Sequence, residues 1–192
     1  MIDGAVIEGA VIEGASWLRR VVAEARCRRG ALSSSREVWD PRGVTDTPQP
    51  TTAGSAWAPG PGVVVLPDGR SVRCRGLRRP EPAQAPEVGY YLLDEAPDFD
   101  WPTNWIEWPD FRLPRDPERA LEQLRDAHRR CADERVELAC HGGIGRTGTA
   151  LAVLAVFSGV DPRDAVKWVR SHYEPRAAET PWQRRWVRRL PR

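Results

Sequence analysis

Lysine is almost missing from this 192-residue chain, and it has neither long apolar runs nor cysteine pairs at zinc-site spacing. Lys167 is its one lysine, so arginine carries nearly all the positive charge, a bias typical of a GC-rich bacterial genome. Acidic and basic residues nearly balance, at a net charge of +2, so we expect no nucleic-acid partner. No stretch is apolar enough for long enough to span a membrane, and we expect a cytoplasmic protein with no membrane partner.

Four cysteines are present, and their spacing predicts no metal site. They are Cys27, Cys74, Cys131 and Cys140. In a reducing compartment they are expected to be free thiols, and a regulatory disulfide between Cys140 and another cysteine stays open. Cys140 differs from the rest because an arginine follows it at the sixth position.

The length indicates one domain with an extension. Residues 1–62 are predicted to form that extension: a short basic amphipathic helix over 16–28, then a linker over 33–62 rich in Ser, Thr, Pro and Gly. Such a linker buries too little apolar surface to fold. The folded domain is therefore predicted to cover residues 63–192.

The hydrophobic pattern of this domain alternates strands with helices. A hairpin is predicted over 63–75, because Pro67-Asp68-Gly69 separates two apolar segments. Further strands are predicted at 88–93 and 136–139, and helices at 117–131, 147–157, 162–172 and 181–190, with caps at Asp116, Asp161 and Thr180. This order predicts an α/β fold with a central mixed, largely parallel sheet flanked by helices.

The segment from Cys140 to Arg146 joins the predicted strand at 136–139 to the predicted helix at 147–157 through a glycine-rich loop. A loop of this kind turns backbone N–H groups inward at a helix N-terminus, which favours phosphate binding. Its dipoles and the Arg146 charge favour the nucleophilic thiolate form of Cys140, and the guanidinium can hold two phosphoryl oxygens at once. The alternative is a glycine-rich turn with a buried structural cysteine.

Cys-x5-Arg followed by Thr-Gly resembles the signature of the cysteine-dependent protein tyrosine phosphatase superfamily, and its Gly-Gly-x-Gly-Arg version is similar to the compact dual-specificity branch. Two further motifs carry the resemblance: Trp108-Pro109-Asp110, and Thr180-Pro181-Trp182-Gln183. The resemblance covers residues 63–189. It implies hydrolysis of phosphotyrosine in a phosphorylated protein through a phospho-cysteine, with phosphoserine and phosphothreonine as further candidate substrates.

The resemblance also implies a role for each site residue. Asp110 is the proton donor, Gln183 orients the attacking water and Thr147 hydrogen-bonds the sulfur. The phosphate loop comprises His141, Gly142, Gly143, Ile144, Gly145 and Arg146. The mechanism needs neither a metal nor an organic cofactor, and a monomer is expected.

The chain departs from the family pattern in three places, one of which is the absence of lysine from the phosphate loop, unlike members that act on lipid phosphates. Ala139 stands where the family usually has a histidine, and no segment matches the aromatic substrate-recognition loop of the large tyrosine-specific members. A phosphoprotein-binding module with little turnover is therefore a rival reading. A phosphatase of a nucleotide, sugar or RNA end is a second rival, and a sulfur-transfer or arsenate-reducing enzyme is a third.

Overall fold

The computed structural model describes residues 57–191, so Cys27 and the predicted helix at 16–28 lie outside the described part. The described residues build a five-stranded sheet of order β1-β2-β5-β3-β4. The strands are β1 (Val63–Val65), β2 (Ser71–Gly76), β3 (Val88–Leu93), β4 (Thr103–Glu107) and β5 (Val136–Cys140). β1 pairs antiparallel with β2 and all other pairs are parallel, which confirms the predicted mixed, largely parallel sheet.

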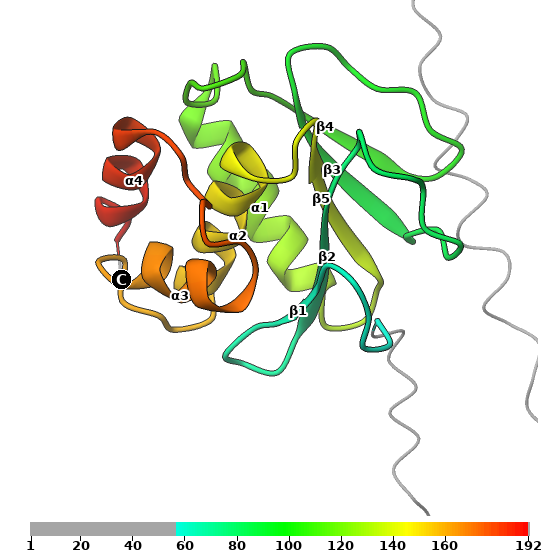
Figure 1. Cartoon of the computed structure of the whole chain (residues 1–192), viewed down its shortest axis with the longest axis horizontal. Coiled ribbons are helices and arrows are strands. Elements are labelled where there is room, and N and C mark those ends of the chain that lie inside the picture. Colours follow the sequence, from blue (N-terminus) through cyan, green and yellow to red (C-terminus); the bar gives the residue numbers. More distant parts are fainter. Residues whose placement is uncertain (1–56, 192) are drawn as a thin grey trace, which may run out of the picture. The chain divides into compact units, whose positions relative to one another are not determined.

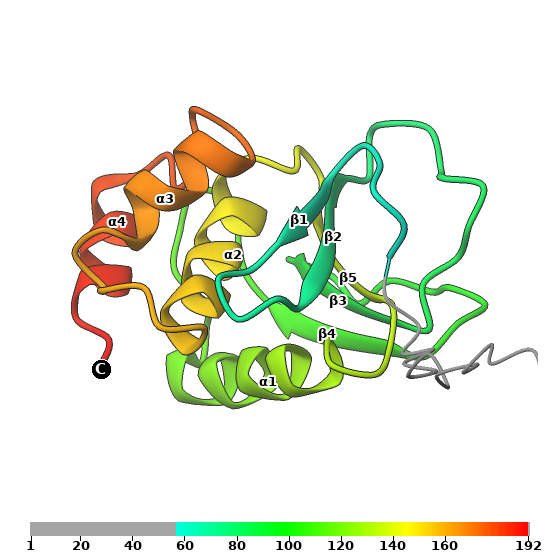
Figure 2. The ribbon, with the colours of Figure 1, turned by 90° about the horizontal axis from the view of Figure 1, so that it is seen from below.

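Helices cover one face of the sheet (Figures 1 and 2). They are α1 (Pro117–Arg130), α2 (Gly145–Phe157), α3 (Ala165–His172) and α4 (Pro181–Arg188). The connections at 77–87 and 94–102 run over the opposite face in both views. Within residues 57–191, no helix combines the length and apolar character that crossing a membrane requires.

Side chains of the central strands alternate between the two faces, as a period of two requires. Tyr90 and Leu92 of β3 join the main core under the helices, whereas Tyr91 and Leu93 join a smaller cluster under the connections. Cys140 ends the fully buried strand β5 and belongs to the helix-side core. The sheet therefore delivers Cys140 to the edge where β5 turns into α2.

The hairpin and α1 form where the sequence predicts them. Gly69 takes a φ of 87°, which the Asp-Gly turn between β1 and β2 needs. Asp116 accepts a hydrogen bond from the backbone N–H of Arg119 at 3.0 Å, and Pro117 opens α1. The turn of the hairpin and the start of α1 each depend on residues next to them in the sequence, and the sequence pattern therefore predicted both.

Three elements differ from the sequence expectation. β4 was not predicted, although it pairs with β3 along its whole length. α2 starts at Gly145, two residues earlier than predicted, so that Arg146 lies in its first turn. α3 starts only at Ala165, because residues 161–164 form a separate turn in which the Asp161 carbonyl accepts from Asp164 N–H.

Trp57 lies six positions before the predicted start of the domain and is buried, with 6% of its surface exposed. Its indole N–H donates to the Val136 carbonyl at 2.8 Å. The guanidinium of Arg73 lies 3.9 Å from the centre of its ring. Residues before Val63 therefore contribute contacts to the sheet.

Candidate active site

The loop between β5 and α2 folds back over the Cys140 thiol. Gly143 adopts a φ of 72°, a left-handed conformation that glycine reaches without steric cost. In this conformation its backbone N–H donates to Cys140 Sγ at 3.2 Å. The loop therefore aims a backbone dipole at the sulfur.

The end of β2 holds this loop from the side. Leu77 N–H donates to the Cys140 carbonyl at 2.9 Å, and Arg78 N–H donates to the His141 carbonyl at 3.1 Å. A Cβ on Gly76 would lie 2.6 Å from the Gly142 carbonyl oxygen, so only glycine allows this approach. On the other side, the Tyr173 hydroxyl donates to the Gly143 carbonyl at 2.6 Å.

The first turn of α2 closes the loop and leaves donors free. The cap residue Ile144 gives it no side-chain hydrogen bond, so the helix N-terminus offers its N–H groups and positive dipole end to an anion. Thr147 is completely buried in this turn, and its Oγ1 has no hydrogen-bond partner among residues 57–191. A buried hydroxyl without a partner is costly in a folded protein and is unusual away from functional sites.

Arg146 is the most heavily bonded side chain of the site, with 2% of its side-chain surface exposed. Its Nη1 donates to Asp94 Oδ1 at 2.9 Å and to the Trp108 carbonyl at 2.8 Å. Its Nη2 lies 3.2 Å from Asp110 Oδ1. These contacts orient the guanidinium and tie it to the segment that carries Asp110.

The segment from Trp108 to Arg112, called the acid loop below, follows β4. Trp108 is fully buried, and its N–H donates to the Leu93 carbonyl at 2.9 Å, which continues the pairing of β4 with β3. Beyond it, Asp110 is half exposed and Phe111 takes a left-handed φ of 55°. The bend turns the Asp110 carboxylate towards Arg146.

One cavity of about 160 Å³ joins these parts. Its walls are Arg78, Asp110, Phe111, Cys140, His141, Gly142, Ile144, Gly145, Arg146 and Glu179. Cys140, Arg146 and Asp110, which lie far apart in the sequence, thus meet in one pocket. Gly143 lies behind the thiol, and the exposed side chain of His141 lies at the rim.

Gln183 does not line this cavity. It is buried in the first turn of α4, where its side chain accepts from Thr180 N–H at 3.2 Å and the Thr180 hydroxyl accepts from Gln183 N–H at 3.3 Å. Its amide also donates to the Arg112 carbonyl at 3.3 Å. Its amide is thus occupied by the helix cap and the acid loop, and its role in orienting water stays a prediction.

Trp182 corrects a sequence-based expectation. The apolar positions of the helix predicted at 181–190 are Trp182, Trp186, Val187 and Leu190, and this pattern predicts that all four face the core. In the structure, 49% of the Trp182 surface is exposed. The reason is the capping box at the start of α4, which turns Gln183 inward and leaves Trp182 at the surface. Its indole N–H donates instead to the Phe111 carbonyl at 2.7 Å.

Sequence reasoning missed three charged residues of the site. Asp94 follows β3 and bonds Arg146, and this hydrogen bond lowers the pKa of the Asp94 carboxyl. Arg78 and Glu179 line the cavity. Glu179 lies so close to α2 that a Cβ on Gly145 would be 2.3 Å from its carboxylate. Each belongs to a segment brought to the loop by the sheet or by α4.

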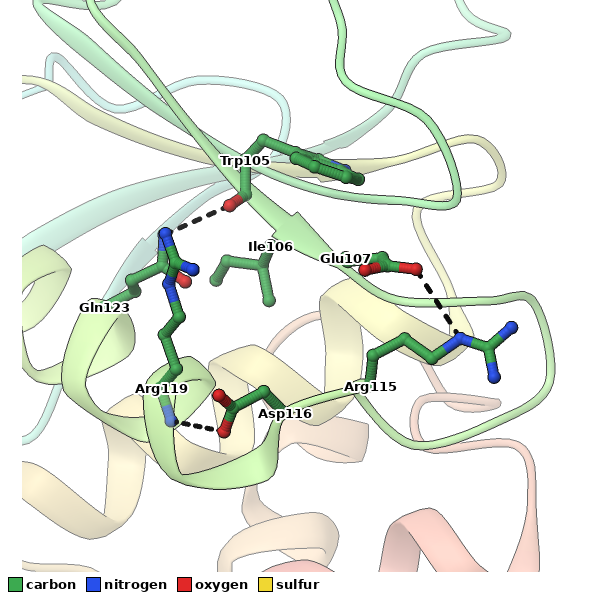
Figure 3. A pocket seen from close by; sticks show the side chains of 7 residues that line it. All are labelled: Trp105, Ile106, Glu107, Arg115, Asp116, Arg119 and Gln123. Atoms are coloured by element: carbon green, nitrogen blue, oxygen red, sulfur yellow. Dashed lines mark hydrogen bonds and ion pairs between the residues drawn. The ribbon is translucent and has the colours of Figure 1, made fainter. Parts of the chain in front are cut away.

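A second hollow of about 110 Å³ lies between β4 and α1 (Figure 3). Two pairs of its polar groups contact each other: Arg115 lies 3.5 Å from Glu107, and the Gln123 amide donates to the Trp105 carbonyl at 3.1 Å. None of its lining residues is a cysteine or serine. Residues 57–191 also contain no group of three His, Cys, Asp or Glu residues that could hold a metal ion. The Cys140 cavity is therefore the candidate active site.

The chain is similar to one family of known proteins and to two solved structures. Residues 94–177 match the family model of the protein-tyrosine phosphatases. The crystal structure of Tk-PTP in the active form aligns with a TM-score of 0.54 and 28% identity, over 68% of this chain and 96% of that one. A glycine-to-alanine mutant form of Tk-PTP aligns with a TM-score of 0.48 and 27% identity, over 54% of this chain and 75% of that one. No curated protein sequence matches the chain.

Proposed function

The matched region of this chain belongs to the protein-tyrosine phosphatase family, and we propose that the protein hydrolyses phosphotyrosine in phosphorylated proteins through a phospho-cysteine at Cys140. The observation that carries this proposal is the meeting of Cys140, Arg146 and Asp110 in one cavity. The set comprises a nucleophile, an anion clamp and a proton donor. Hydrolysis of a phosphate monoester by this route proceeds through a covalent intermediate that these three side chains, the loop N–H groups and water form and resolve.

In the first step, the Cys140 thiolate attacks phosphorus and the bond from phosphorus to the phenolic oxygen breaks. Backbone N–H groups of the loop and the Arg146 guanidinium hold the equatorial oxygens, where negative charge develops. Asp110 gives its proton to the departing oxygen. Asp110 lines the cavity and its carboxylate lies 3.2 Å from the Arg146 guanidinium, and this closeness to the proposed anion clamp supports the role.

In the second step, water attacks the phospho-cysteine and the bond between phosphorus and sulfur breaks. Asp110, now ionised, takes the proton from the water, and inorganic phosphate leaves. The sulfur departs as a thiolate, which a hydrogen-bond donor stabilises. The buried Thr147 hydroxyl, without a partner among the described residues, is our candidate for this donor.

Ala139 stands where the family usually has a histidine, and the backbone N–H of Gly143, which donates to Cys140 Sγ at 3.2 Å, is a different group that contacts the proposed nucleophile. The binding-module reading has less support, since nucleophile, arginine and acid all line the cavity. The proposal extends to phosphoserine and phosphothreonine. Rates on three phosphopeptides that differ only in the phosphorylated residue will rank these substrates.

The test is hydrolysis of p-nitrophenyl phosphate in the presence of EDTA by the native chain, Cys140→Ser and Asp110→Ala. We expect activity that survives chelation, is lost in Cys140→Ser and falls about a hundredfold to ten-thousandfold in Asp110→Ala. A folded native protein with no activity would favour the binding module. Activity that persists in Cys140→Ser would exclude the cysteine mechanism.

A further inference from the structure

Trp182 is exposed at the surface of α4 but contacts the backbone of the acid loop. About half of this aromatic side chain is exposed, and its indole N–H donates a 2.7 Å hydrogen bond to the Phe111 carbonyl. Phe111 follows directly after Asp110. The bond therefore joins α4 to the backbone next to the proposed proton donor, across 71 positions of sequence.

The carbonyl of the next residue is bonded in the same way. The Gln183 amide donates to the Arg112 carbonyl at 3.3 Å, and the Trp108 indole donates to it at 2.8 Å. Trp186, one turn further along α4, packs edge-on against Trp108 with ring centres 5.6 Å apart. α4 thus contacts the acid loop at both of its ends and at the residue after Asp110.

The acid loop needs such external support. Phe111 has a left-handed φ of 55°, a conformation that residues with a bulky side chain seldom adopt on their own. Within the loop, the Arg112 N–H donates to the Pro109 carbonyl at 3.2 Å and the Phe111 N–H donates to the Asp110 carboxylate at 3.1 Å, and neither bond reaches the Phe111 carbonyl. Strained backbone persists where neighbouring structure fixes it, and here the Trp182 bond reaches the strained residue itself.

We propose that Trp182 is a positioning residue: its indole N–H fixes the backbone at Phe111 and thereby aims the Asp110 carboxyl at the leaving oxygen. This inference rests on the proposed function, in which Asp110 is the proton donor. Arg146 holds the acid loop from the cavity side, and Trp182 holds it from outside. Because Trp182 itself does not line the cavity, we expect its loss to affect proton donation more than phosphate binding.

The test is Trp182→Phe, which removes the N–H and keeps an aromatic ring. Rates are compared on phenyl phosphate, whose basic leaving group depends on the donated proton, and on p-nitrophenyl phosphate, whose leaving group depends on it less. We expect kcat on phenyl phosphate to fall about tenfold, the effect of one hydrogen bond. The fall on p-nitrophenyl phosphate should be markedly smaller, and KM should change little on either substrate.

Trp168→Phe is the matched control, because Trp168 lies on α3, stacked on His172 with ring centres 4.4 Å apart, and outside the cavity. It should leave both rates unchanged. Asp110→Asn should show the same substrate order as Trp182→Phe with larger losses. Trp182→Leu, which carries no side-chain hydrogen-bond donor, must reproduce the pattern, and thermal melts verify that each variant is folded.

Equal losses on both substrates, or no loss on either, would overturn the role of Trp182 and leave the phosphatase proposal intact. An inactive native chain, or an active Cys140→Ser, would instead overturn the phosphatase proposal itself. The two failures are distinguishable because they appear in different proteins of the same set.

Discussion

Trp57 gives a quantitative test of where the folded domain begins. Sequence composition placed the start at Val63, and the structure buries Trp57 against β5 and Arg73. We predict that Trp57→Ala strongly destabilises the full-length chain. Removing residues 1–62 should do the same, whereas removing only 1–56 should not.

The expected size follows from what Trp57 buries. A tryptophan covers about 200 Å² of apolar surface, worth about 5 kcal/mol at about 25 cal/mol/Å², and this is an upper value because denatured chains already bury some of it. The bond from its indole to the Val136 carbonyl adds about 1 kcal/mol. Measured losses for such truncations are about 3–5 kcal/mol. A typical domain has about 5–15 kcal/mol in total, so the loss is a large fraction of it.

The assay is equilibrium unfolding in urea followed by circular dichroism. With a slope of about 2 kcal/mol per molar, a loss of 3–5 kcal/mol lowers the midpoint by about 2 M. Val65→Ala is the matched control, because 61% of Val65 is exposed on β1 and its truncation should cost less than about 0.5 kcal/mol. If Trp57→Ala stays within about 1 kcal/mol of the native chain, Trp57 is not part of the core and the domain begins later.

Two further predictions concern the cavity. Arg146→Lys keeps the positive charge but loses the two-pronged guanidinium that can hold two phosphoryl oxygens. We therefore expect kcat/KM for p-nitrophenyl phosphate to fall about a hundredfold to a thousandfold. A variant that retained a tenth of the activity would contradict this role of the guanidinium. Iodoacetate at pH 7 should modify Cys140, with loss of activity, before Cys74 and Cys131. Burial raises the pKa of Cys131 to about 12 and that of Cys74 well above its usual value, so both stay protonated and unreactive until the solution is strongly alkaline. Peptide mass spectrometry measures this order, and equal labelling of the three thiols would count against it.

Local signals explain why much of the fold was predictable. The turn at Gly69, the cap at Asp116 and the capping box at Thr180 each depend on residues within four positions. The Cys140 loop is equally local, since its glycines bend one short segment between a strand and a helix. In all of these, neighbouring side chains determine the backbone.

The strand β4 and the hydrogen-bond partner of Trp182 depend on distant residues, which the local pattern does not show. Thr103–Glu107 is short and only partly buried, and it becomes a strand because β3 supplies parallel partners such as Leu92 for Ile106. Trp182 has an apolar side chain at a helical position, but its N–H finds the Phe111 carbonyl of another segment. Neither partner is visible from the residues next to it.

Asp94 is predictable from the pairing of the strands, although not from the residues next to it. Tyr91 of β3 pairs with Ala139 of β5, so the residues that follow β3 emerge beside Cys140 at the carboxyl edge of the sheet. Ligand sites of parallel sheets form at this edge. A charged residue directly after a strand adjacent to β5 is therefore a candidate partner for the site, and Asp94 is such a residue. Its bond to Arg146 at 2.9 Å follows from the order of the strands, which the hydrophobic pattern leaves undetermined.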